Sequence, residues 1–212
     1  MIKKIVKGFS AGFLIGMAGA LFMLAKAQGF KLLPSLVFPV GLFLICTFGF
    51  DLYTGKIGFV FDKTRGIKIA DLITMLVSNA VGAMLFGLIF TAIFGGDAAV
   101  SAAAEAVAKA KFGELTALSA ALVLLKSALC GILVYIGVYL FGKSEGFGAK
   151  ALAIWIPIAS FVYLGLDHSI ANMFYLSAMI SFSLEGAALI VIAIVGNSIG
   201  AIAFDRALAL IR

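Results

Sequence analysis

The stretch Gly165-Leu166-Asp167-His168-Ser169-Ile170-Ala171-Asn172 interrupts a long apolar run and contains the only histidine among 212 residues. The residues on both sides of it are apolar enough to lie within a lipid bilayer. An ionisable side chain at membrane depth is costly, so its presence points to a site that handles an ion or a proton. The structural alternative is a histidine that only forms hydrogen bonds within a helix break.

The composition indicates an integral membrane protein. Hydrophobic residues make up 64% of the chain and charged residues 12%, with a mean hydropathy of +1.20. Soluble domains average about 45–50% apolar residues. The first apolar run, residues 8–25, follows three lysines as in a signal peptide, but it is long and no convincing cleavage site follows it. We therefore interpret this run as a retained first crossing.

The sequence predicts six membrane crossings, since about 20 helical residues span a bilayer core of roughly 30 Å. They fall near residues 8–28, 34–61, 68–95, 115–141, 150–182 and 186–210. The second and fifth runs are too long for one straight crossing, and polar residues and glycine interrupt them at 49–56 and 165–172. Unsatisfied amides in lipid are costly, so these breaks must face protein or a wet cavity. We predict an all-α membrane fold whose second and fifth transmembrane helices are broken.

Lysine and arginine in the short loops predict the orientation. With the N-terminus inside, the cytoplasmic side collects Lys3, Lys4, Lys7, Lys63, Arg65, Lys68, Lys143, Lys150, Arg206 and Arg212. The opposite side keeps Lys26, Lys31, Lys109 and Lys111, partly balanced by Asp97, Glu105, Glu114 and Glu185. We predict that both termini are cytoplasmic and that the protein lies in the cell membrane. This bias largely explains the formal charge of +6, so nucleic acid is not an expected partner.

An internal repeat is the strongest evidence for the architecture. Asn79-Ala80-Val81-Gly82-Ala83-Met84-Leu85-Phe86 matches Asn197-Ser198-Ile199-Gly200-Ala201-Ile202-Ala203-Phe204 at an offset of 118. Other pairs have nearly the same offset: Pro39 with Pro157, Gly49-Phe50-Asp51 with Gly165-Leu166-Asp167, and Ser10-Ala11 with Ser127-Ala128. Each half holds three crossings, so the second half must enter the membrane from the opposite side.

We therefore predict one transmembrane channel domain, residues 1–212, built as a 3+3 inverted repeat. Repeat 1 covers about 6–96 and repeat 2 about 114–210. This arrangement brings the two helix breaks together near the midplane and is typical of pores and carriers. Glycines at Gly8, Gly12 and Gly16 have the spacing that favours close helix packing, although glycine is also common in membrane helices generally.

Four segments resemble the signature segments of the formate/nitrite transporter family. They are residues 38–42 (FPVGL), 51–55 (DLYTG), 165–174 (GLDHSIANMF) and 196–200 (GNSIG). The resemblance runs from about Val6 to Phe204, and the segment around His168 is highly specific. It implies an aquaporin-like fold, a homopentamer with one pore per protomer, and passage of formate, nitrite or hydrosulfide.

The resemblance also implies roles for individual residues. His168 would be the central pore histidine, Thr54 its hydrogen-bonding partner, and Asn197 a hydrogen-bonding residue near the pore or the break. A protonated imidazole could stabilise the passing anion or give it a proton. Protons are therefore expected to take part in transport, together with the anion. Phe38, Leu42 and Phe161 would form a constriction on the cytoplasmic side. Tyr53 and Val134 would help to form the outer constriction.

Several residues depart from the family pattern or leave alternatives open. Gly131 replaces a usual asparagine, which would remove a possible donor and widen or soften the pore; Tyr53 replaces a usual phenylalanine. Lys56 could pair with Asp51 or face the vestibule. Lys126 could attract anions into the outer vestibule or extend to the lipid interface. Asp51 and Asp167 are expected to cap the half-helices that follow them.

Two other functional classes were weighed. A passive pore for water, glycerol or ammonia would suit the same fold, but paired Asn-Pro-Ala motifs are missing and the centre carries an ionisable residue. An enzyme fits poorly, because the sequence has no metal-ligand cluster, no nucleophile paired with a base and no nucleotide loop. No cofactor or metal is expected. Cys46 and Cys130 lie in apolar segments and suggest no disulfide. The residues do not select among formate, nitrite and hydrosulfide.

Overall fold

The computed structural model describes residues 1–179 and 183–211, which contain helices and no strands. Residues 180–182, at the end of the fifth predicted crossing, and Arg212 lie outside the described residues. The elements are α1 (Ile2–Ala27), α2 (Leu33–Val37), α3 (Pro39–Phe48), α4 (Tyr53–Lys56), the 3-10 helix η1 (Ile57–Phe59), α5 (Ile69–Phe94), α6 (Ala98–Lys111), α7 (Ala117–Lys143), α8 (Phe147–Tyr163), α9 (Ser169–Ala178) and α10 (Leu184–Ala209).

Among the residues that the structure describes, four helices are long and apolar enough to cross a membrane: α1, α5, α7 and α10. Their bounds agree within a few residues with the first, third, fourth and sixth predicted crossings, except that α1 begins earlier. The second predicted crossing is a broken one, in which 33–48 and 53–59 meet at a bend of 64°. The fifth predicted crossing contains α8 and the shorter α9, so the total of six crossings stays a prediction.

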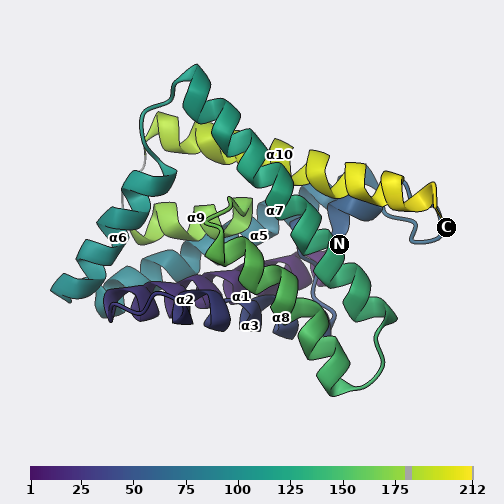
Figure 1. Cartoon of the computed structure of the whole chain (residues 1–212), viewed down its shortest axis with the longest axis horizontal. Helices are drawn as coiled ribbons and strands as arrows, with labels where there is room; N and C mark the ends of the chain where they lie inside the picture. Colours follow the sequence, from purple (N-terminus) through teal and green to yellow (C-terminus); the bar gives the residue numbers. More distant parts are fainter. Residues whose placement is uncertain (180–182, 212) are drawn as a thin grey trace.

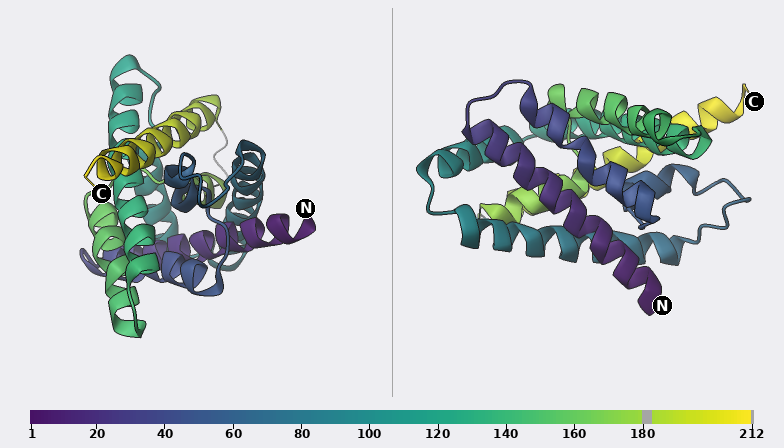
Figure 2. Two further views of the ribbon diagram at one scale, coloured as in Figure 1. Left: turned by 90° about the vertical axis from the view of Figure 1, so that its right-hand side faces the viewer. Right: turned by 90° about the horizontal axis from the view of Figure 1, so that it is seen from below.

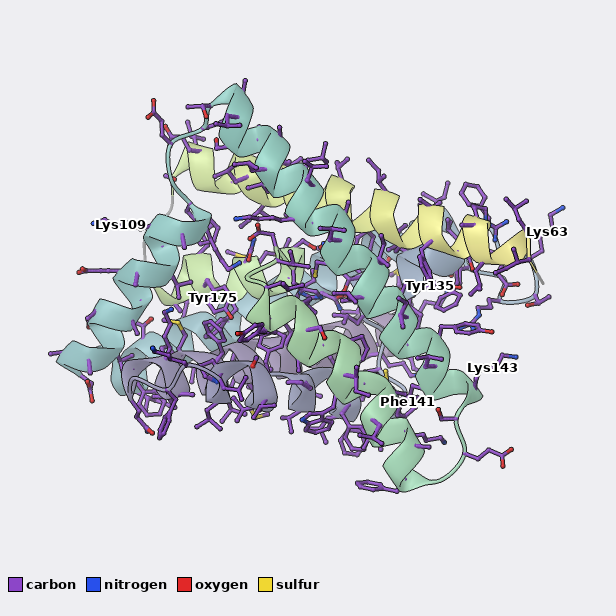
Figure 3. The ribbon with its side chains drawn as sticks, viewed as in Figure 1. Lys63, Lys109, Tyr135, Phe141, Lys143 and Tyr175 are labelled. Carbon is purple, nitrogen blue, oxygen red and sulfur yellow. The ribbon has the colours of Figure 1, made fainter. Side chains whose placement is uncertain are left out.

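The two ends of the long axis of the molecule carry different segments. Both chain termini lie toward one end, which also holds Lys63 and Lys143, and we call this the terminal side (Figures 1 and 3). Helix α6, with Lys109, lies at the opposite end, which we call the α6 side. Figure 2 shows α1 running between these ends, so the segment after α1 begins on the α6 side.

Two features of the helices were not predicted from the sequence. The segment 98–111 forms α6, which packs against α1 and α9 and is capped by Asp97, whose carboxylate accepts hydrogen bonds from two backbone N–H groups. In addition, α2 and α3 are separate helices because Pro39 has no N–H to continue the first one. Pro157, its partner in the repeat, lies inside the continuous helix α8.

Glycines allow α1 to pack on α5, and α10 to pack on α7, at backbone contact distance. A Cβ at Gly12 would overlap the carbonyl oxygen of Asn79, and a Cβ at Gly131 would overlap that of Asn197. The interpretation of Gly131 as a residue that widens the pore was therefore wrong. This position lies at a close backbone contact between α7 and α10, and no side chain fits there.

We predict that Gly200→Ala destabilises the protein, because a Cβ at Gly200 would overlap the carbonyl oxygen of Ala128 and force α7 and α10 apart. Overpacking of this kind costs about 1–3 kcal/mol. Thermal unfolding of the purified protein in detergent, followed by the fluorescence of its single tryptophan, should show a lower Tm. The matched control is Gly142→Ala, where nothing lies within 4 Å of the new methyl group. Equal Tm values for the two variants would contradict the prediction.

Candidate functional site

The two helix breaks have the same backbone form. Gly49 ends α3 with a φ of 67°, and Gly165 follows α8 with a φ of 66°, a left-handed conformation that glycine adopts without strain. Three residues later the backbone is extended, at Leu52 in one break and His168 in the other, and a short helix begins at the next residue. The breaks are related by an offset of 116 residues, as the repeat predicts.

One buried asparagine holds each break in place. The Tyr53 N–H donates to Asn79 Oδ1 at 2.7 Å, and the Ser169 N–H donates to Asn197 Oδ1 at 2.9 Å. The amide groups of the two asparagines donate in turn to backbone carbonyls, those of Gly8 and Asp51 for Asn79 and those of Ser127 and Asp167 for Asn197. Asn197 thus bonds to the helix break, one of its two expected positions. Both of its amide hydrogens are occupied there.

His168 joins the two breaks and caps α9. Its Nδ1 accepts a hydrogen bond from the Ala171 N–H at 3.1 Å, and its Nε2 lies 2.8 Å from Thr54 Oγ1. A backbone N–H can only donate, so Nδ1 carries the lone pair and the neutral ring keeps its proton on Nε2. This proton is donated to Thr54. The expectation that Asp51 and Asp167 cap the short helices was wrong, because the capping side chain of α9 is His168 and α4 has no side-chain cap.

A small cavity, which we call the inner cavity, lies beside His168 on the α6 side. Its volume is about 40 Å³, and its lining includes Phe38, Phe161, His168, Asn172, Tyr175 and Lys111. The Phe161 ring stacks on the His168 imidazole with centroids 5.8 Å apart, and Phe38 meets Phe161 edge to face at 5.7 Å. Two aromatic rings thus form an apolar wall against the central histidine.

A charged pair forms the polar part of the inner cavity. Lys111 Nζ donates to Asp167 Oδ1 at 2.8 Å and to the Leu166 carbonyl at 3.3 Å. Asn172 Nδ2 donates to the same carboxylate oxygen at 3.2 Å. The Lys111 side chain is 14% exposed and that of Asp167 4% exposed, so the pair is largely desolvated. A buried carboxylate requires such partners.

The inner cavity is followed toward solvent by a wide vestibule of about 960 Å³. Lys26, Lys31, Lys111 and Lys126 all contribute to its lining. This placement favours the vestibule over the lipid interface for Lys126. Lys111 lines both spaces and therefore marks the passage from the vestibule to the inner cavity.

The residues predicted to form the cytoplasmic constriction, Phe38, Leu42 and Phe161, lie on the α6 side. Phe38 and Phe161 share the inner cavity with Lys111, the last residue of α6. Leu42 follows Phe38 by about one turn of α3 and is 3% exposed within the same apolar core.

Tyr53 and Val134 lie on the terminal side of this constriction. Tyr53 belongs to an apolar cluster with Leu72, near the start of α5, and Ala201, near the end of α10. Val134 is 1% exposed and follows Ser127, whose carbonyl accepts a hydrogen bond from Asn197, by seven residues of α7 in the direction of Lys143 on the terminal side (Figure 3). The Tyr53 hydroxyl, the departure from the family pattern, lies 2.9 Å from Ser198 Oγ.

The assignment of the two constrictions to sides was therefore reversed. With the predicted cytoplasmic termini, Phe38, Leu42 and Phe161 lie on the outer side, and Tyr53 and Val134 lie on the cytoplasmic side. The physical reason is chain direction. The second crossing begins where α1 ends, away from the N-terminus, so Phe38 and Leu42, before its break, lie on the α6 side and Tyr53, after it, on the terminal side. Phe161 comes from the fifth crossing and joins the α6 side through its contact with Phe38 and its place in the lining of the inner cavity.

The open role of Lys56 is settled in favour of the ion pair, since its Nζ lies 3.8 Å from Asp51 Oδ1. Three residues of the inner cavity were missed: Lys111, Asn172 and Tyr175. Asn172 and Tyr175 could have been found, because they follow His168 by four and seven residues and so share its face of α9. Lys111 had no such signal, since it comes from a helix that was not predicted.

Comparison with known proteins agrees with this geometry. The family model described as formate/nitrite transporter matches residues 1–211. A probable formate transporter of Methanothermobacter thermautotrophicus is 35% identical over 202 residues, which cover 82% of this chain and 73% of that protein. The nitrite transporter NirC of Escherichia coli (strain K12) is 30% identical over 145 residues, covering 64% of this chain and 52% of that protein.

Solved structures show the same fold. A pentameric formate channel with formate bound superposes with a TM-score of 0.82 at 22% identity, covering 99% of this chain and 96% of that one. A second structure, described as an FNT family ion channel, has a TM-score of 0.83 at 23% identity and covers 99% of this chain and 90% of that one. The family comprises channels and transporters, which are not enzymes. By its sequence along nearly its whole length, this chain belongs to the formate/nitrite transporter family.

Proposed function

We propose that the protein carries small monovalent anions of weak acids, such as formate, nitrite or hydrosulfide, with proton-assisted passage at His168. The observation that carries this proposal is the position of His168. It joins the two helix breaks through Thr54 and lines a small cavity that opens, past Lys111, toward a vestibule with four lysines. The relatives named as formate and nitrite transporters support the same class of solute.

The lysines of the vestibule raise the local concentration of anions, as clefts of one charge sign do. Lys111 then directs the anion toward the inner cavity. There the rings of Phe38 and Phe161 exclude hydrated cations, since they offer no polar atoms to replace a hydration shell. Tyr53 and Val134 form the second constriction, beyond the histidine.

Proton assistance at His168 follows a simple charge balance. When the ring carries two protons, its positive charge stabilises the anion beside it. Transfer of one ring proton to the anion leaves a neutral imidazole and a neutral weak acid, which crosses an apolar constriction far more readily than the anion does. Protonation of Nδ1 must break its hydrogen bond with the Ala171 N–H. The cap of α9 thus opposes the charged state of the ring.

The assembly and the orientation belong to the same proposal. We propose a homopentamer in the cell membrane, because a structural neighbour is a pentameric formate channel. The excess of lysine and arginine on the terminal side supports a cytoplasmic position for both termini. The vestibule and the aromatic constriction then face the outside.

A flux assay tests the function itself. Liposomes that contain the purified protein should take up formate, nitrite or hydrosulfide faster than empty liposomes do. Competition among the three anions at two pH values would identify the preferred solute. Conduction of water or glycerol without flux of any of these anions would contradict anion transport and would indicate a passive pore for neutral solutes.

We predict that His168→Asn removes the histidine-dependent inflection from the pH profile of formate flux. Histidine side chains titrate between about pH 5 and 8, whereas asparagine does not. Asparagine can still accept from the Ala171 N–H as a helix cap, so the break should keep its form. The profile is measured in liposomes with the same pH on both sides. Thr54→Val is the control, because it removes a hydrogen bond and leaves the ring. An inflection that persists in His168→Asn would eliminate the proton role.

We predict that Lys111→Met lowers formate uptake by about tenfold or more, because it leaves the Asp167 carboxylate buried without its cation. The control is Lys109→Met, an exposed lysine on the same helix. The double variant Lys111→Met with Asp167→Asn separates two explanations. Recovery of uptake would mean that Lys111 only neutralises Asp167, whereas continued loss would support its role in guiding the anion.

A further inference from the structure

The inner cavity contains two polar groups that the contacts described so far do not use. They are the side-chain amide oxygen of Asn172, Oδ1, and the hydroxyl of Tyr175, and both residues belong to α9. His168, Asn172 and Tyr175 recur at intervals of four and three residues, so they form one stripe along the face of α9 that lines the cavity. Figure 3 shows Tyr175 in the interior of the molecule, close to α1 and α6.

Asn172 Oδ1 is a buried acceptor that lacks a donor. The residue is 2% exposed, and no hydrogen bond reaches this oxygen from any part of the chain that the structure describes. The direction of the amide is fixed by Asp167, whose carboxylate can only accept when ionised and so requires the Nδ2 side of Asn172. A buried acceptor without a donor is costly. A bound molecule with an O–H or N–H group would satisfy it.

Tyr175 supplies the complementary group. It is 4% exposed and lies among aromatic rings, with Phe174 at 5.3 Å and Phe22 at 5.7 Å between centroids. Within residues 1–179 and 183–211, no hydrogen bond is formed by its hydroxyl. Buried tyrosine hydroxyls usually have a partner. This O–H can donate to a carbonyl oxygen of a bound solute.

The charges around the inner cavity favour a neutral solute over a bare anion. The ammonium of Lys111 is paired with the Asp167 carboxylate at 2.8 Å, and the His168 tautomer described above is neutral. Once His168 has given its proton to the anion that Lys111 directed there, the paired charges of Lys111 and Asp167 largely cancel, so the solute is held in the cavity in its protonated, neutral form. An anion would also present only acceptors to Asn172 Oδ1, which repels them.

We propose that the inner cavity binds the protonated, neutral form of the weak acid through Asn172 and Tyr175. The acid O–H donates to Asn172 Oδ1, and the acid carbonyl accepts from the Tyr175 hydroxyl. The space is adequate, because about 10–15 Å³ holds one water molecule and this cavity has about 40 Å³. Formic acid has three heavy atoms. This inference rests on the proposed function and makes Tyr175 a specificity-determining residue for it.

Formamide provides the test, because it has the shape of formic acid, offers an N–H donor beside a carbonyl acceptor, and cannot ionise. Initial rates of formate uptake into liposomes are measured over a range of formate concentrations, with and without formamide. We expect formamide to raise the KM for formate without lowering the maximal rate. In Tyr175→Phe, which removes only the hydroxyl, formamide inhibition should weaken by about three- to tenfold, the loss typical of one hydrogen bond.

Tyr163→Phe is the matched control, since its tyrosine is exposed and lines the vestibule and not the inner cavity. Formamide inhibition of this variant, measured relative to its own uninhibited rate, should equal that of the wild type. If Tyr175→Phe does not assemble, Tyr175→Met provides a second side chain without a hydroxyl. Saturable formate uptake that formamide does not affect, or equal inhibition in wild type and Tyr175→Phe, would overturn the inference and leave the proposed function standing. An absence of flux for formate, nitrite and hydrosulfide in the wild type would refute the proposed function, and the inference with it.

Discussion

The structure depends on satisfying the backbone polar groups of two helix breaks that lie at membrane depth. Lipid offers no hydrogen bonds, so each break needs donors and acceptors from the protein itself. Asn79 and Asn197 meet this need with the same three hydrogen bonds. Each accepts a hydrogen bond from the backbone N–H that follows the break, and donates one to a carbonyl within the break and one to a carbonyl of a neighbouring helix. The close glycine contacts of α1 with α5 and of α7 with α10 bring these asparagines within reach.

His168 combines a structural and a chemical role because of this requirement. As the cap of α9 it accepts from the Ala171 N–H through Nδ1, which fixes the position of the ring proton on Nε2 and directs it to Thr54. A change in the charge of the ring therefore changes the hydrogen bonding of the break itself. The structural and functional interpretations of this histidine, which are alternatives at the level of sequence, describe the same contacts.

The repeat explains which parts of the site could be predicted from the sequence. Gly49 with Gly165, and Asn79 with Asn197, recur at nearly one offset because the same backbone problem is solved twice, so the breaks were predictable. The contact of Thr54 with His168 was implied by the family resemblance. Lys111 was not, since α6 has no counterpart in the repeat and its contact with Asp167 exists only after folding. The sides of the constrictions were assigned wrongly because they were transferred from a resemblance without following the chain from α1.

Equivalent positions of the repeat carry different side chains on the two sides of His168. Asp51 and Asp167 are equivalent by position, and so are Lys56 and Asn172, which follow them by five residues. On the terminal side Lys56 itself pairs with Asp51, at 3.8 Å and in partial contact with solvent. On the α6 side asparagine replaces the lysine, and the cation comes instead from Lys111, outside the repeat. This substitution leaves a neutral amide beside His168, with one oxygen free for a solute. The two breaks thus share one backbone form, and we infer that the few side chains that differ between them determine what the cavity can bind.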